Sequence, residues 1–314
     1  MRISTSHLLN NMMEGVTKQL SHLNKLSQDA ATGKRIRRPS NDPVAASRSL
    51  ALRALKSGLN QHKNNVADSR DWLLATETAL MNLNGLFEQA NDLVLDAANQ
   101  TRSDKDKEAF VQELDRIIEE AVAVLNTRHD DRFIFGGLAT TVKPFSFESG
   151  EADEFGKIIY HGADDSTGRK EIEVEPGMIM QVNINGKSAF MTSIEGAGGR
   201  SITEALIDIR NHVAQPYSSP TFHDDLADDI DSIVAIQDHI LNHVTGVGAK
   251  VRNLARVSDK LSQNEVELAS LLSKAEDADI AETIVELQLQ HTVYMAILYS
   301  TSDIMKTSLL DYLR

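Results

Sequence analysis

The sequence predicts a mainly α protein with an inserted β-rich domain, built as a long antiparallel helical bundle or coiled-coil rod with paired N- and C-termini. Three observations predict this class. Apolar residues recur at alternating spacings of four and three at both ends and in two long inner segments, which is typical of helices that pack on helices. Alternation with a period of two is confined to residues 144–191. Aromatic residues make up only 5% of the chain, which suits long helices better than a compact globule.

The two ends are predicted to be amphipathic helices that bind partners. Their apolar seams define the predicted assembly interface, which consists of Leu9, Met13, Val16, Leu20, Leu23, Ile280, Ile284, Leu287, Tyr294, Leu298 and Met305. One narrow apolar stripe on each helix gives little burial to offset the backbone entropy of ordering both ends. We therefore expect ends that are disordered in the monomer and ordered when they pack with neighbouring subunits.

Two long helices are predicted inside these ends. Pro39 interrupts the first amphipathic pattern, and Asp42 followed by Pro43 is a start signal, with Asp as the N-cap and Pro at the first helical position. The seam then continues to Ala97. Ser103 is expected to cap a third helix that turns back along the second. A matching long seam runs from Leu226 to Leu272.

Short strands are predicted between the two long helices, in the segments PFSF, KIIYHG, KEIEVE, MIMQVNI and SAFM. Asn185 and Gly186 are expected to form a tight hairpin turn. The predicted division has three parts: a terminal coiled-coil assembly domain (1–42 and 273–314), a helical rod domain (43–137 and 201–272) and an inserted β-rich variable domain (138–200).

Composition excludes several functional classes. A net charge of -14 and a pI near 5.1 argue against nucleic acid as a partner, because phosphate contacts need a basic surface. Cysteine is absent, so no disulfide or cysteine-ligated metal is expected. No apolar run is long enough to cross a bilayer. The start, MRISTSHLLNNMMEGV, lacks the features of a cleaved signal peptide, which favours a cytosolic protein or export without a leader.

No catalytic, cofactor-binding or metal-ligating residue is assigned, and no cofactor is expected. His239 and His243 have a metal-ligand spacing, but no HExxH or EF-hand pattern surrounds them. Gly186-Lys187-Ser188 is similar to the end of a phosphate loop but lacks the earlier glycine. The basic linker TGKRIRRPSNDP is expected either to contact an acidic neighbour in an assembly or to be solvated.

Several segments together resemble one known family. They are MRISTS, ATGKRIRRPSNDPVAA, FIFGG, VGAKVRNL, EDADIAETIVELQ and SLLDYL, which fall in residues 1–136 and 222–314. The chain resembles the flagellin superfamily, on its branch of hook-associated proteins at the hook–filament junction. The middle of the chain matches no family pattern.

The resemblance implies a structural adaptor of the bacterial flagellum and not an enzyme. Implied partners are the first flagellar hook-associated protein, flagellin, further copies of the chain in a ring, an export chaperone and the type III export apparatus, with neither nucleic acid nor membrane insertion. The implied location is the hook–filament junction, reached without a cleaved signal peptide. Two alternatives remain: a short filament flagellin, and a metal- or phosphate-binding enzyme domain between helical arms.

Overall fold

The computed structural model forms two compact units. It describes residues 5–40, 42–98, 104–148, 156–163, 168–217 and 219–312. The first unit comprises residues 1–58 and 263–314, and the second comprises residues 59–262. Helices dominate both units, and the strands of the described ranges all lie in the second. The predicted class, mainly α with an inserted β-rich region, is confirmed; the predicted three-part division stays a prediction.

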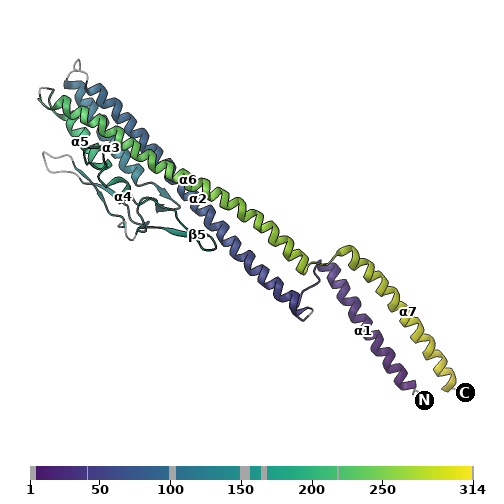
Figure 1. Cartoon of the computed structure of the whole chain (residues 1–314). Helices are drawn as coiled ribbons and strands as arrows, with labels where there is room; N and C mark the ends of the chain where they lie inside the picture. Colours follow the sequence, from purple (N-terminus) through teal and green to yellow (C-terminus); the bar gives the residue numbers. More distant parts are fainter. Residues whose placement is uncertain are drawn as a thin grey trace. The chain divides into compact units, whose positions relative to one another are not determined.

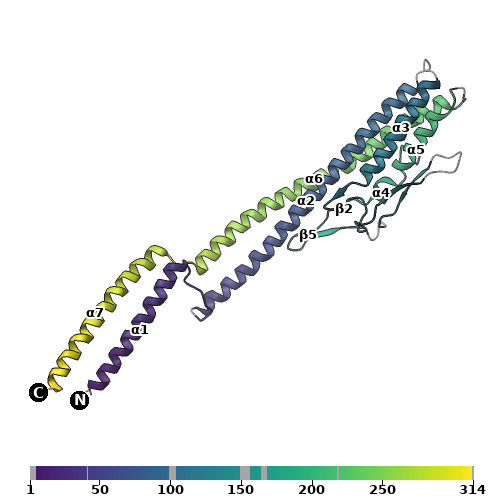
Figure 2. The same cartoon turned by 180° about the vertical axis from the view of Figure 1, so that it is seen from behind.

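The first unit is built on the two terminal helices. Helix α1 (Thr5–Thr32) and helix α7 (Ile280–Tyr312) lie side by side in both views (Figures 1 and 2). The first turns of α2 (Pro43–Ala97) and the last turns of α6 (Phe222–Glu276) also belong to this unit. Helix α1 ends before Gly33, whose φ of 68° is a left-handed conformation that glycine adopts without strain.

Aspartates start two of these helices. The Asp42 carboxylate accepts the N–H groups of Val44 and Ala45 at 3.1 and 3.0 Å, which confirms the predicted N-cap of α2. Asp279 caps α7 in the same way, because its Oδ1 accepts the N–H groups of Ala281 and Glu282 at 2.9 and 3.1 Å. Each carboxylate satisfies backbone donors that have no partner within the first helical turn.

The second unit is organised by the antiparallel helices α2 and α6 (Figure 1). On each helix the deepest positions repeat every seven residues, as expected of a coiled-coil seam. These buried residues are Leu59, Val66, Leu73, Leu80, Phe87 and Val94 on α2, and Leu226, Ile233, Ile240, Val247, Leu254 and Leu261 on α6. Helices α3 (Asp104–Leu125) and α5 (Ile202–Ala214) pack on each other beside this pair. The predicted cap Ser103 lies outside the described residues.

Three two-stranded antiparallel ribbons follow α3. They pair β1 (Arg128–His129) with β2 (Arg132–Phe133), β3 (Phe145–Glu148) with β4 (Lys157–Tyr160), and β5 (Glu171–Glu175) with β6 (Met178–Gln181). The last four strands fall in four of the predicted segments. The first ribbon was not predicted; its two turn residues, Asp130 and Asp131, have φ of 47° and 60°, as in a type I′ turn.

The predicted strand SAFM and the hairpin at Asn185-Gly186 are wrong. Residues Gly186–Phe190 form the short helix α4, and Asn185 is its N-cap, accepting the Lys187 N–H at 2.8 Å. A Cβ at Gly186 would lie 2.7 Å from the carbonyl oxygen of Phe135, so glycine permits this close packing. A tight hairpin turn that contains a glycine lies instead between β5 and β6, where Gly177 has a φ of 77°.

Aromatic side chains join the ribbons to α4. The ring of Phe190 meets those of Phe135 and Phe145 edge-on, with centroids 4.9 and 6.1 Å apart, and all three side chains are buried. Trp72, the only tryptophan of the chain, is buried on α2. The Lys170 ammonium lies 4.0 Å from its ring centroid, a cation–π contact.

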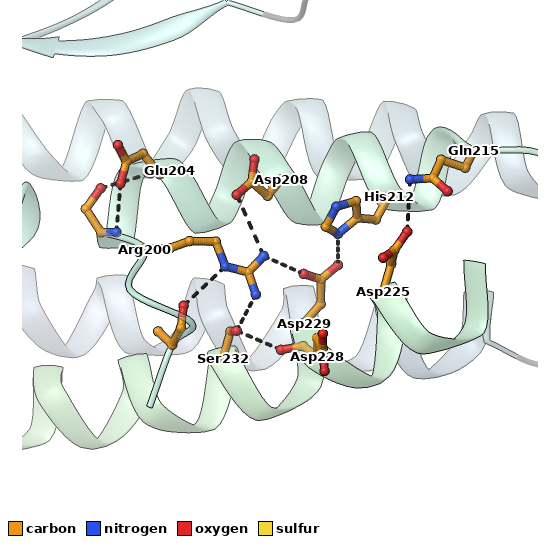
Figure 3. Close-up of polar contacts among 11 residues, drawn as sticks. Arg200, Glu204, Asp208, His212, Gln215, Asp225, Asp228, Asp229 and Ser232 are labelled. Atoms are coloured by element: carbon orange, nitrogen blue, oxygen red, sulfur yellow. Dashed lines mark hydrogen bonds and ion pairs between the residues drawn. The ribbon is translucent and has the colours of Figure 1, made fainter. Parts of the chain in front are cut away.

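A buried carboxylate ties the start of α6 to α5 (Figure 3). The Asp229 side chain is fully buried; Arg200 Nη1 donates to its Oδ1 at 3.0 Å, and His212 Nδ1 lies 2.9 Å from its Oδ2. Arg200 also donates to Ser232 Oγ at 2.5 Å. The bond to Asp229 raises the pKa of His212, and the charges of Asp229, Asp225 and Asp208 act in the same direction. The buried Asp229 carboxylate is therefore paired with the Arg200 guanidinium and hydrogen-bonded to the His212 imidazole.

The stability of the second unit should fall as pH rises above about 6.5, the ordinary pKa of histidine. Because the folded-state pKa of His212 is raised, its contribution is fully present below the unfolded-state pKa and is lost as pH rises through the folded-state pKa. Substitution His212→Gln, which keeps a hydrogen-bond donor but does not titrate, should remove this loss, about 1.5–3 kcal/mol for a bond to a charged group. Urea unfolding followed by circular dichroism between pH 6 and 9 measures it.

His223→Gln is the matched control, because His223 is an exposed histidine on α6, the helix that carries Asp229. Its pH profile should follow that of the wild type. Identical pH slopes for wild type and His212→Gln would contradict the assigned role of the His212–Asp229 bond.

Candidate assembly surface

Polar contacts fix the alignment of α1 and α7. Gln19 Nε2 on α1 donates to the Gln290 carbonyl oxygen at 3.2 Å and to its side-chain Oε1 at 2.5 Å. His22 and Glu286 approach within 3.9 Å one turn further along. These contacts place the apolar seams of the two helices beside each other.

The structure brings together three of the predicted interface residues. Leu20 and Leu23 on α1 and Leu287 on α7 line one groove between the helices. The same groove is also lined by polar side chains, namely Asn24, Ser27, Gln288, His291 and Thr292. The contact between α1 and α7 is therefore amphipathic and open, unlike the closed seam of α2 and α6.

The other predicted interface residues remain largely uncovered within the unit. Val16 and Tyr294 are half-buried. Met13 is 61% exposed, and Ile280, Ile284 and Leu298 are also exposed, as is Leu20 although it lines the groove. The side chains of Leu9 and Met305 lie outside the part of the chain that the structure describes. That these residues contact other subunits stays a prediction.

Sequence reasoning missed a second apolar face of α7. Val285, Leu289 and Tyr299 are 67%, 56% and 73% exposed, and none lies on the predicted seam. The sequence signal for this face is the run IVELQLQHTVYMAIL, in which apolar residues fall on several sides of the helix. A search for a single heptad stripe ignores the apolar residues that lie outside that stripe. Within the described ranges, no helix combines the length and apolarity that a membrane span requires. Exposed apolar surface of this kind is typical of protein-association sites.

A buried glutamate holds the linker between α1 and α2. The Glu276 side chain is 2% exposed, and Arg53 binds it with two hydrogen bonds of 2.7 Å. Lys34 Nζ donates to the same carboxylate at 2.9 Å, and Ser49 Oγ also donates to it. The Arg53, Ser49 and Lys34 hydrogen bonds and the Lys34 charge outweigh burial and lower the pKa of Glu276 to about 2.

Backbone bonds complete this clamp. The N–H groups of Arg35 and Ile36 donate to the Glu276 carbonyl oxygen at 2.8 and 3.3 Å, and Ala278 N–H donates to Gly33 O at 2.9 Å. The turn that leads into α7 is thereby fastened to the linker that follows α1. The C-terminal end of α1 and the N-terminal end of α7 are therefore anchored to each other, so the exposed faces of the two helices keep a fixed orientation relative to each other at that end.

The basic linker finds acidic partners within its own unit. Lys34 contacts Glu276, and Arg37 Nη2 donates to the buried Asp29 carboxylate at 2.8 Å. Arg38 is exposed. Arg35 Nη1 also lies 4.0 Å from Asp42 Oδ2, so three of the linker's four basic side chains are paired inside the chain, an alternative that the sequence interpretation did not include.

A further apolar stripe lies on the second unit. Leu74 and Met81 on α2 are 38% and 49% exposed, and Val234 and Leu241 on α6 are 50% and 42% exposed. Each of these four residues directly follows a buried seam residue, so its side chain is rotated about 100° around the helix axis from the seam. In an antiparallel pair, the same rotation on both helices brings the exposed residues of α2 and those of α6 to the same side of the pair. The sequence reasoning listed the seam and overlooked this flank.

Comparison with known proteins gives consistent matches. Residues 3–140 match the family described as the bacterial flagellin N-terminal helical region. A flagellar hook-associated protein 3 from Salmonella typhimurium is 27% identical over 191 residues, which cover 60% of this chain and 57% of that protein. The chain therefore spans less than two thirds of the length of that relative. A flagellin from Clostridium tyrobutyricum is 24% identical over 127 residues, 40% of this chain and 34% of that protein.

A solved structure supports the fold. The crystal structure of flagellar hook-associated protein 3 from Legionella pneumophila aligns with a TM-score of 0.63 and 14% sequence identity. The alignment covers 71% of this chain and 98% of that one. At this identity the likeness concerns the arrangement of helices and strands and not the identity of contact residues.

Substitution Glu276→Gln should release the linker. It leaves Lys34 and Arg53 without their counter-charge, and breaking a buried ion pair typically costs about 3–5 kcal/mol; partial exposure of both cations brings the expected loss to the lower end. Amide hydrogen exchange at Arg35, Ile36 and Ala278 should accelerate accordingly. Acid should have the same effect. Because the folded-state pKa of Glu276 is lowered, its ionised carboxylate stabilises the fold above the unfolded-state pKa of 4.5, and this contribution is lost as the pH falls toward 2.

Asp277→Asn is the matched control, since Asp277 is the exposed neighbour of Glu276. Its exchange rates should stay at the wild-type level. Unchanged protection of Arg35 and Ile36 in Glu276→Gln would show that the backbone bonds hold the linker without the carboxylate.

Proposed function

We propose that this chain, whose residues 3–140 match the family described as the bacterial flagellin N-terminal helical region, is the structural junction protein that joins the flagellar hook to the filament. The observation that carries the proposal is the α1–α7 pair, which lies in the terminal segments typical of the family and leaves apolar side chains exposed on α7. The match to a flagellar hook-associated protein 3 from Salmonella typhimurium supports it.

The physical basis is burial at contacts between subunits. The exposed apolar area of Val285, Leu289 and Tyr299 is covered if α7 packs against helices of neighbouring copies. Each large apolar side chain that becomes buried contributes about 1.5–3 kcal/mol. A ring of copies repeats this gain at every contact without ordering additional chain. One end of the ring would bind the first hook-associated protein, and the other would receive flagellin.

An adaptor of this kind performs no catalysis, so its function requires shape and adhesion only. We infer that the chain leaves the cell by flagellar type III export without a cleaved leader and acts at the hook–filament junction. An export chaperone that covers the apolar surface of α7 before export is part of the same proposal, because exposed apolar helices associate unspecifically.

A short filament flagellin is the second candidate, and the match to a flagellin favours it. Gene deletion in the motile host separates the two functions. Bare hooks with flagellin released into the medium are the expected result, because filament subunits then have no junction protein on which to assemble. Bare hooks without extracellular flagellin would identify the chain as the filament subunit, and normal filaments would contradict both functions. Electron microscopy of cells and immunoblotting of the medium give the readouts.

Substitution Leu289→Asp should abolish incorporation into flagella while changing the stability of the subunit by less than about 0.5 kcal/mol, because Leu289 is 56% exposed in the free subunit. Complementation of the deletion strain measures motility and incorporation, and thermal unfolding measures stability. Gln288→Asp adds the same charge at the adjacent exposed polar position and should be tolerated better. Full motility with Leu289→Asp would remove this face of α7 from the assembly.

A further inference from the structure

Three polar atoms converge where α6 passes α4. The Nε2 atoms of His239 and His243, one helical turn apart on α6, lie 3.2 Å from each other. His239 Nε2 also lies 3.1 Å from the carbonyl oxygen of Ala189, a fully buried residue of α4. Both imidazoles are half-buried.

Hydrogen bonding alone leaves this cluster under-satisfied. If His239 Nε2 carries a proton, that one N–H is shared between Ala189 O and His243 Nε2. If His243 Nε2 carries the proton instead, the lone pair of His239 Nε2 faces Ala189 O without a hydrogen between them. Protons on both nitrogens would repel at 3.2 Å. One proton therefore serves three lone-pair-bearing atoms, whereas a cation would interact favourably with all three.

We propose that His239 and His243 form a chelating site for a first-row divalent transition-metal ion, with the Ala189 carbonyl oxygen as a third donor. Two ligands at about 2.0–2.1 Å from a tetrahedral Zn²⁺ are about 3.3 Å apart. The two measured separations, 3.2 Å between nitrogens and 3.1 Å from nitrogen to oxygen, are close to this edge length. Histidines at positions i and i+4 of a helix are a known arrangement for holding one metal ion.

The chemistry of the donors selects the kind of ion. Neutral imidazole favours Zn²⁺, Cu²⁺ or Ni²⁺ over Mg²⁺ or Ca²⁺, which prefer oxygen. Burial, with smaller effects from His239 and Lys250, lowers the pKa of His243, so its ring stays neutral at pH 7 and available as a ligand. Within the described ranges no group of three or more His, Cys, Asp or Glu side chains is placed to hold a metal. Water or a donor from another molecule would complete the coordination.

Binding of a metal ion at this site would connect two helices. A bound ion would link α6 directly to the last turn of α4, and through α4 to the aromatic cluster around Phe190. Lys250 lies close enough to lower the pKa of His243, so its positive charge also opposes the ion. Affinity should therefore rise when this charge is removed, and it should fall in acid, because a protonated imidazole cannot act as a ligand.

Isothermal titration of the full chain with ZnCl₂ at pH 7.5 tests the proposal. One ion per chain is expected, with affinity reduced at least about tenfold in His243→Ala and in His239→Ala, because losing a direct ligand costs at least as much as losing an outer-shell partner. Lys250→Gln should bind more tightly than the wild type. MgCl₂ should give no comparable heat.

His223→Ala is the matched control, since His223 is on the same helix and has no histidine four residues away. Its affinity should equal that of the wild type. Absence of saturable Zn²⁺ binding, or equal binding by the wild type and His243→Ala, would overturn the proposal. If either alanine variant fails to fold, Lys250→Gln decides, because unchanged or weaker binding in that variant would also overturn it.

Discussion

The seven-residue repeat of buried side chains on α2 and α6 is the constraint from which the second unit is built. It fixes which face of each helix is covered, and so also which flank carries α3, α5 and the ribbons and which flank is left bare. Leu73 and Leu80 are fully buried, whereas the residues that directly follow them, Leu74 and Met81, are 38% and 49% exposed. One repeat therefore defines both the core and the uncovered surface of this unit.

Helices were predictable from sequence because their signals are local and redundant. The cap at Asp42 and the seam of α2 agree with the structure, since caps and heptads are read within a few residues. The strand assigned to SAFM failed because four residues contain too few periods to separate a strand from a helical turn. Close packing of Gly186 against Phe135 decides the conformation there, and such tertiary contacts leave no local signal.

Buried charge was the least predictable part of the candidate site. Glu276 meets Lys34 and Arg53 across more than 200 residues of sequence, and Asp229 meets Arg200 across 29. Nothing in the spacing of these residues distinguishes them from solvated surface charges. The apolar face of α7 was missed for another reason: a single-stripe interpretation suits a helix with one partner, whereas α7 carries apolar residues beyond the face that meets α1.

The position of the single tryptophan determines what spectroscopy can see in this chain. Trp72 is 3% exposed, lies beneath the Lys170 ammonium and meets the His129 ring edge-on, with centroids 6.0 Å apart, all within the second unit. Intrinsic fluorescence excited at the indole band therefore reports the opening of that unit alone. Fraying or ordering of α1 and α7 is silent in that signal, so the terminal helices need a probe of their own.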